Sequence, residues 1–223
     1  MKSSASAVLA VGLMLGGHSA FAQDLSRYRD YVLGTSLESI VAATGANSTD
    51  ARTIQVRPAA IQELLWRAPY VAFGDPSADP VRHIAFSFYN DALYQVVVNY
   101  HRQRTEGLTN DDVIYALSVT YGPPAVASAR NRADVPADAF TGGIVLARWQ
   151  DAEALLTLVG AANTPEFQLI VTSKTLGAQA RSAIKEAARL DSVEAPQRER
   201  KDASDAATAR EKTRVANRAA FRP

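Results

Sequence analysis

Apolar residues recur at helical spacing in two similar stretches of the sequence. The first is LGTSLESIVAATG at 33–45, and its apolar face is formed by Leu37, Ile40, Val41 and Thr44. The second is TEGLTNDDVIYALSVTYGPP at 105–124, and its apolar face is formed by Val113, Ala116, Leu117 and Thr120. The pattern predicts helices over 36–44 and 110–121.

Capping residues mark both ends of these predicted helices. Thr35 precedes the first run and Glu38 lies three residues further on, which is the pattern of a capping box. Thr109 takes the corresponding place before the second run. Gly45 follows the first run, where glycine fits the left-handed conformation that ends many helices. Gly122 ends the second run, and Pro123-Pro124 prevents its continuation. Both stretches therefore predict a bounded helix rather than a catalytic loop.

Alternation of apolar and polar residues predicts a β-hairpin at 84–102. The apolar positions of the outgoing strand are Ile84, Phe86 and Phe88. Asn90-Asp91 supplies the turn. One face of the return strand is predicted to carry Tyr94, Val96, Val98 and Tyr100.

Six more runs complete the expected secondary structure. TIQVR and IQELLWR, separated by Pro58, are expected to be extended or mixed. IVLARWQ, ALLTLVG and EFQLIVTS are predicted to be strands joined by polar turns. The following run, AQARSAIKEAARLDSVE, has an alanine-rich apolar face and predicts a third helix that Pro196 ends.

This order predicts an α+β fold with helices packed on an antiparallel sheet. Trp66 follows the first helix and Trp149 follows the second, which suggests tandem α-β-β-β units. The predicted divisions are a signal peptide at 1–22, a first unit at 23–107, a second unit at 108–177, a C-terminal helix at 178–195 and a charged, disordered tail at 196–223.

The C-terminal tail differs in composition from the rest of the chain. It is rich in Ala, Arg, Lys, Glu and Asp and has few large apolar residues. Such a segment cannot bury enough apolar surface to offset the entropy of ordering. Its composition is compatible with a disordered extension or with a helix that carries alternating charges on its surface. Because basic residues outnumber acidic ones, the tail also suits weak contact with an anionic membrane surface or cell-wall polymer.

The first 22 residues have the three parts of a secretory signal peptide. Lys2 provides the basic start, an apolar run follows, and Ala20-Phe21-Ala22 forms the cleavage motif. Cleavage is expected between Ala22 and Gln23, which predicts a periplasmic or secreted protein. No other segment is apolar enough to suggest a transmembrane span.

Composition excludes several kinds of site. The chain has no Cys, which rules out disulfides, thiol nucleophiles and zinc-thiolate centres. The net charge is +1, so nothing in the overall charge suggests a nucleic-acid partner. Neither a P-loop nor a dinucleotide-binding glycine motif occurs, and no cofactor is predicted.

The two histidines beyond the signal peptide are His83 and His101, at the open end of the predicted hairpin. They could supply a general base with a nearby Asp or Ser, which makes an envelope hydrolase the alternative function. A metal site would require a third ligand, and the spacing of the acidic residues provides none. We therefore predict neither a metal nor a catalytic residue.

Aromatic and basic residues on the hairpin form the candidate binding surface. Exposed Tyr and Arg are enriched where proteins bind partners. The candidate residues are Tyr89, Tyr94, Tyr100, His101, Arg102 and Arg104.

The two helix stretches resemble those of the BamE (SmpA/OmlA) family of periplasmic α/β modules. The resemblance lies in Gly34, Thr35-Ser36, Ile40 and Gly45, and again in Gly107, Thr109, Val113, Gly122 and Pro124. It implies a helix followed by an antiparallel sheet, in tandem, and it assigns no functional residue. The lipid-anchor Cys of that family is missing here. The sequence favours a non-enzymatic module that binds an envelope protein or another envelope component.

Overall fold

The structure is a computed structural model that describes residues 24–69, 79–127, 139, 143–161 and 166–222. Its main feature is an antiparallel sheet of eight strands in the order β3-β4-β5-β6-β10-β9-β8-β7. The strands are β3 Ala51–Gln55, β4 Ile61–Arg67, β5 Val81–Tyr89, β6 Ala92–Tyr100, β7 Val126–Ala127, β8 Gly143–Gln150, β9 Ala154–Ala161 and β10 Phe167–Ser173.

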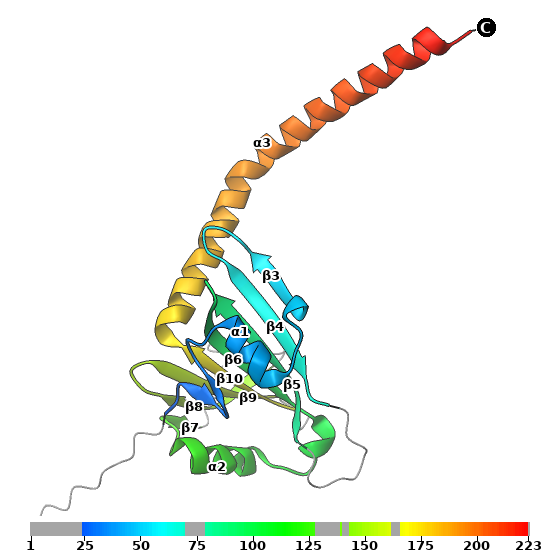
Figure 1. Cartoon of the computed structure of the whole chain (residues 1–223). Coiled ribbons are helices and arrows are strands. Elements are labelled where there is room, and N and C mark those ends of the chain that lie inside the picture. The colour runs from blue at the N-terminus through cyan, green and yellow to red at the C-terminus, as the bar shows by residue number, and fades with distance from the viewer. Residues whose placement is uncertain (1–23, 70–78, 128–138, 140–142, 162–165, 223) are drawn as a thin grey trace, which may run out of the picture.

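Helices and a small hairpin accompany this sheet (Figure 1). The helices are α1 Leu37–Thr44, α2 Asn110–Tyr121 and α3 Lys174–Ala220. The hairpin pairs β1 Arg27–Tyr28 with β2 Tyr31–Val32, and single 3-10 turns lie at η1 Ser48–Asp50 and η2 Arg102–Arg104. The fold is therefore α+β, as the sequence predicts.

The two halves of the chain share one sheet. In each half a helix is followed by strands that are consecutive in the sheet, and four strands follow each helix instead of the expected three. The halves meet where β6 pairs with β10, and Val97 lies opposite Ile170 at the centre of that pairing. This arrangement is symmetric in its topology, and a duplication in the sequence stays a prediction.

One face of the sheet, called here the first face, carries the main hydrophobic core. Phe86, Leu64 and Leu156 are fully buried there. Ile40 of α1 packs into the same cluster, and α2 contributes partly buried apolar residues. Burying each large side chain stabilises the fold by about 1.5–3 kcal/mol, so this layer of helices and hairpin supplies most of the driving force.

Each tryptophan ties its strand to the end of the preceding helix. Trp66 of β4 donates its indole N–H to the carbonyl of Thr44 at the end of α1, at 3.2 Å. Trp149 of β8 donates to the carbonyl of Gly122 at the end of α2, at 2.7 Å. The last carbonyls of a helix have no hydrogen-bond partner within the helix. In both halves of the chain, the indole N–H of a tryptophan supplies such a partner.

The helix caps follow the sequence closely. Thr109 and Asp112 form a complete capping box at the start of α2, as expected of Thr109. At α1 the cap is Ser36, whose hydroxyl accepts from the backbone N–H of Ser39, and not Thr35 as predicted. The hydroxyl of Thr35 instead donates to the carbonyl of Val32. The predicted cap therefore lies one residue before the observed cap, Ser36.

A β-bulge corrects the prediction for the hairpin. Phe88 pairs with Leu93 and Ser87 pairs with Gln95, which leaves Tyr94 as the extra residue on β6. A bulge changes the alternation of side chains along its strand. Tyr94 therefore lies against Gly177 of α3 and does not share a face with Val96, Val98 and Tyr100.

Helix α3 begins on the second face of the sheet and then leaves it. Its buried residues are Gly177, Ala180 and Ala183. A Cβ at Gly177 would come within 2.9 Å of the Thr172 methyl, so glycine allows close packing on β10. Figure 1 shows the rest of the helix running away from the body to the C-terminus.

The prediction that Pro196 ends the third helix is wrong. The helix continues through Pro196 to Ala220, and the segment expected to be a disordered tail is helical. Proline removes one hydrogen bond, here to the carbonyl of Ser192, but its fixed φ is compatible with a helix. Helix-forming residues and ion pairs such as Lys201–Asp205 follow it and support continuation.

We expect Trp149→Phe to destabilise the protein more than Trp66→Phe. Both substitutions remove an indole hydrogen bond worth about 1 kcal/mol, but Trp149 is 1% exposed and its replacement also leaves a cavity. The predicted loss is about 2–3 kcal/mol for Trp149 and about 1 kcal/mol for Trp66.

Urea denaturation followed by fluorescence measures both losses, because each variant retains the other of the two tryptophans as its reporter. Equal losses in the two variants would contradict the difference in burial.

Candidate functional site

A hollow of about 350 Å³ lies on the second face of the sheet, beside the part that α3 covers. Its floor is built from neighbouring strands β4, β5, β6 and β10. The lining residues are Glu63, Leu65, His83, Ala85, Ser87, Gln95, Val97, Asn99 and Gln168.

An apolar row crosses the middle of this hollow. Leu65 lies opposite Ala85, Ala85 lies opposite Val97, and Val97 lies opposite Ile170 on β10. Ala85 has the shortest side chain of the row and leaves space between its neighbours. Since paired residues on one face are direct neighbours, the row is a continuous apolar strip across four strands.

Polar rows flank the strip about 7 Å away on either side, two residues along each strand. One row runs through Glu63, Ser87, Gln95 and Thr172. The other runs through Arg67, His83, Asn99 and Gln168. The second face thus carries an apolar strip between two lines of hydrogen-bonding groups. Leu65 is exposed at one end of this strip, whereas Val97 and Ile170 are buried in a small cluster with Ala85 and Ala139 packed against it.

Two side-chain hydrogen bonds stabilise the seam between the halves. Gln95 donates through Nε2 to the Thr172 hydroxyl at 3.2 Å, and Gln168 donates through Nε2 to Asn99 Oδ1 at 3.0 Å. Both pairs lie directly opposite each other across β6 and β10, on either side of the Val97–Ile170 pair. Buried amides need such partners, and the bonds fix the orientation of these side chains.

Other polar groups at the hollow have no partner within the described part of the chain. Gln95 is only 6% exposed, and its side-chain carbonyl accepts no hydrogen bond there. The hydroxyl of Ser87 and the imidazole of His83 likewise make no hydrogen bond to described residues. These three groups are oriented by the sheet and are available to a ligand.

Burial and neighbouring cations lower the pKa of His83. The largest cause is desolvation, followed by the charges of Arg82, Arg67 and His101. His83 therefore favours the neutral form and could accept a proton. Glu63, the carboxylate of the hollow, pairs with Ser87 four residues away along β5, about 13 Å from the position of His83. This register gives His83 no orienting carboxylate from within the hollow.

The predicted binding residues do not form one surface. Tyr89 lies at the end of β5 and lines a shallow depression of about 360 Å³ between α3 and Pro58. Tyr94 packs beside Gly177 of α3. Both tyrosines therefore help to seat α3 on the sheet, and α3 partly covers them.

Tyr100 lies on the first face, in a cluster of phenols. It lies close to the phenol of Tyr28, and Tyr121 of α2 is their neighbour. Burial is the main cause that raises the pKa of all three phenols, that of Tyr121 to about 12. Tyr121 also donates to the carbonyl of Arg27 at 3.3 Å, so the cluster holds the β1–β2 hairpin against α2 and β6.

An ion pair between Arg29 and Asp79 lies beside Tyr28 of this phenol cluster. Arg29 binds Asp79 in a bidentate manner at 2.6 and 2.8 Å, and its guanidinium lies 5.3 Å from the centre of the Tyr28 ring. Hydrogen bonding to Arg29 is the main cause that lowers the pKa of Asp79. Arg29 has a φ of 53°, an uncommon conformation for a non-glycine residue. The sequence analysis missed this pair, whose members lie 50 residues apart.

The remaining predicted residues follow β6. His101 begins the turn η2, which contains Arg102 and Arg104 and ends at the buried Thr105. The hydroxyl of Thr105 donates to the carbonyl of His101. His101, Arg102 and Arg104 follow Tyr100 in the sequence, but they form no shared pocket with it, because Tyr100 faces the core.

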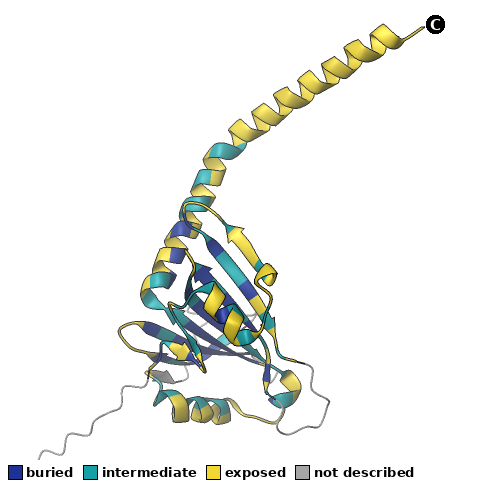
Figure 2. Cartoon of the chain, in the orientation of Figure 1, coloured by how far each residue is buried: buried dark blue, intermediate teal, exposed yellow. Residues whose placement is uncertain are grey.

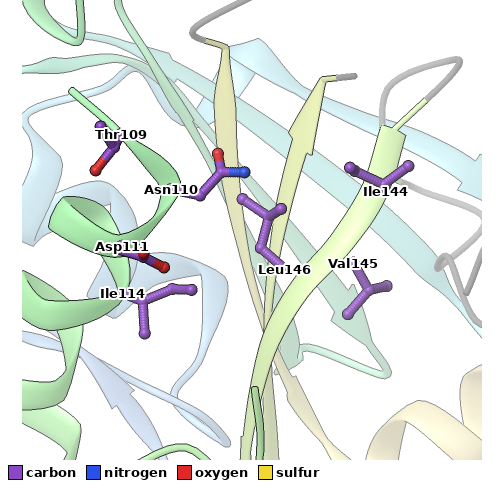
Figure 3. A pocket seen from close by; sticks show the side chains of 7 residues that line it. All are labelled: Thr109, Asn110, Asp111, Ile114, Ile144, Val145 and Leu146. Atoms are coloured by element: carbon purple, nitrogen blue, oxygen red, sulfur yellow. The ribbon is translucent and has the colours of Figure 1, made fainter. Parts of the chain in front are cut away.

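A second hollow, of about 400 Å³, lies between the start of α2 and β8 (Figure 3). Its lining residues are Thr109, Asn110, Asp111, Ile114, Ile144, Val145 and Leu146. A helix N-terminus can attract anions, but the capping box already uses the N–H of Asp112, and the carboxylates of Asp111 and Asp112 add negative charge. This hollow therefore offers little to an anionic ligand.

Among the described residues no cluster of three or more His, Asp or Glu side chains could hold a metal ion. No helix in the same part of the chain combines the length and the apolar character needed to cross a membrane. The predicted cleavage site at Ala22 and Gln23 lies outside the described residues.

The phenol cluster predicts a loss of stability at alkaline pH. A phenol whose pKa is raised by folding binds its proton more tightly in the folded state, so its contribution is complete below pH 10 and declines as pH rises toward the folded pKa. We expect the free energy of unfolding to fall between about pH 10 and 12, by about 1–2 kcal/mol for Tyr121 alone.

Urea titrations of the wild type and Tyr121→Phe between these pH values measure the effect, and the variant should show a shallower decline. Tyr115→Phe is the matched control, because Tyr115 is 73% exposed on the outer face of α2. An unchanged slope in Tyr121→Phe would show that burial of this phenol is not linked to folding.

Comparisons with protein-family models, with curated proteins and with solved structures gave no match to this chain. The resemblance to the BamE family therefore stays a prediction from the two helix stretches. The function has to be argued from the geometry of the second face.

Proposed function

We propose that this protein is an exported, non-enzymatic binding module of the cell envelope and that it binds its partner in the hollow on the second face. The observation that carries this proposal is the set of oriented polar groups around an apolar strip. Gln95, Ser87 and His83 present hydrogen-bonding atoms without partners among described residues, and Leu65 and Ala85 provide apolar contact. Binding sites commonly combine a mostly apolar surface with a few fixed polar groups.

The hollow favours a partner with an apolar face and uncharged hydrogen-bonding edges. Its charged groups are few, and burial lowers the pKa of His83, which favours the uncharged imidazole. Desolvating neutral groups costs less than desolvating charges, so such a partner loses little on entering the hollow. An amide-rich or hydroxyl-rich envelope component has this character, and a peptide segment of an envelope protein is included in this class.

The alternative function, an envelope hydrolase with His83 or His101 as base, has weaker support. His101 begins a turn at the end of β6, and His83 lies in the hollow without an orienting carboxylate. A general base gains its direction from a hydrogen-bonded third group. The binding role requires only groups that are already in place.

Export rests on the N-terminal pattern of a basic start, an apolar run and Ala20-Phe21-Ala22. We expect the protein recovered from a bacterial envelope fraction to begin at Gln23. Intact-mass analysis of protein expressed with its own N-terminus tests this, and replacing Ala20 and Ala22 with bulky residues should prevent processing. A cell-associated product that retains Met1 would contradict export.

Substitutions in the hollow test the binding role. Gln95→Met keeps the size of the side chain and removes its hydrogen-bonding atoms, and Ala85→Trp fills the space above the apolar strip. We expect either change to reduce capture of envelope components by the immobilised protein by about tenfold or more, because each removes about 1–2 kcal/mol of binding. Ala42→Trp, on the exposed side of α1, is the matched control for added bulk.

Thermal melting of each variant confirms that the fold is retained before capture is compared. The proposal fails if stable Gln95→Met and Ala85→Trp proteins capture the same components, in the same amounts, as the wild type and the control.

A further inference from the structure

The outer part of α3, residues 197–220, stands apart from the body. All of its residues are exposed (Figure 2). At a rise of about 1.5 Å per residue, this part of the helix is about 36 Å long. A helix that is polar on all sides and packs on nothing depends on its own side-chain pairs or on an external partner.

Charge is distributed unevenly along this arm. Residues 197–205 contain three basic and three acidic residues and are neutral overall. Residues 206–222 contain five basic residues and one acidic residue, a net charge of +4. The whole positive charge of the arm therefore lies in its distal half, farthest from the body.

Three of these basic residues form a stripe along one face. Arg210, Arg214 and Arg218 follow one another at intervals of four residues, and Arg222 continues the interval just beyond the helix. Each step moves about 40° around the helix axis and about 6 Å along it. The guanidinium groups thus form a gently curved line, which we call the arginine stripe.

This stripe works against the stability of the isolated helix. Like charges four residues apart destabilise a helix by about 0.2–0.5 kcal/mol per pair. Of the three arginines of the stripe within the helix, Arg214 alone has a counterion among the described residues, because it binds Glu211 at 2.6 and 2.7 Å. Arg210 and Arg218 make no ion pair with described residues.

The part of α3 that precedes this distal half, residues 174–205, shows the opposite arrangement. Arg189 pairs with Glu186, Arg198 pairs with Asp191 and Lys201 pairs with Asp205. Those positions balance their charges within the helix. The distal half has Glu211 as its single carboxylate for five basic residues, so its excess positive charge is complementary to an anionic partner and not to the helix itself.

We propose that the arginine stripe binds a linear polyanion, an extended polymer that carries phosphate or carboxylate groups. A line of planar guanidinium groups matches successive oxyanions and can bind each one with two hydrogen bonds. A membrane surface fits less well, because the distal half has only Val215 and Phe221 as large apolar residues and forms no apolar face. This site goes beyond the proposed binding hollow and does not depend on it.

The test uses the complete protein and fluorescently labelled inorganic polyphosphate, with binding followed by anisotropy at low and physiological ionic strength. The stripe variant is Arg210→Gln, Arg214→Gln and Arg218→Gln. The matched control is Arg198→Gln, Lys201→Gln and Lys212→Gln, which removes the same net charge from the opposite side of the same helix. Circular dichroism establishes that both variants retain the helix.

We expect the stripe variant to bind polyphosphate on the order of tenfold or more weakly than the control, and binding by the wild type to weaken steeply with salt. Polyglutamate in place of polyphosphate shows whether carboxylates serve as well as phosphates. Equal weakening in both variants, or no binding by the wild type at low salt, would overturn the proposal. Tighter binding to vesicles of an anionic phospholipid than to either polymer would also overturn it, in favour of a lipid surface.

Discussion

The pairing of β6 with β10 is the constraint on which the rest of the structure depends. Each half of the chain forms a meander of four strands. In the sheet, the two meanders join through their last strands, β6 and β10. The register with Val97 opposite Ile170 sets how the two halves align, and short connections such as the Asn90-Asp91 turn set the register of hairpins within each half. The same pairing brings the apolar residues of both halves onto the first face and aligns Gln95 with Thr172 on the second.

Much of this fold could be predicted from the sequence, because its signals are local. Gly45 has the left-handed φ of 66° expected at a helix end, and Asn90-Asp91 forms the hairpin turn with φ values of 47° and 69°. Thr109 caps α2 as its position before Asp112 suggests. Turn and cap residues act over three or four positions, so a single sequence is enough to find them.

The candidate site could not be predicted in the same way. A single bulge at Tyr94 turns that side chain toward α3, and no residue type in the hairpin marks the position of a bulge. The hollow consists of rows that run across strands, and the opposition of Leu65 to Ala85 depends on register and not on spacing along the chain. The pair of Arg29 and Asp79 is likewise created by folding alone.

Continuation of α3 past Pro196 has a consequence for how two ligands would be arranged. The hollow lies on the body, and the arginine stripe lies at the far end of an arm that is about 36 Å long. This separation exceeds the electrostatic screening length of about 8 Å several times over, so the charge of one ligand is not felt at the other. The arm would act as a spacer that holds the body at a defined height above a polymer, within reach of neighbouring molecules and clear of the polymer's own charge.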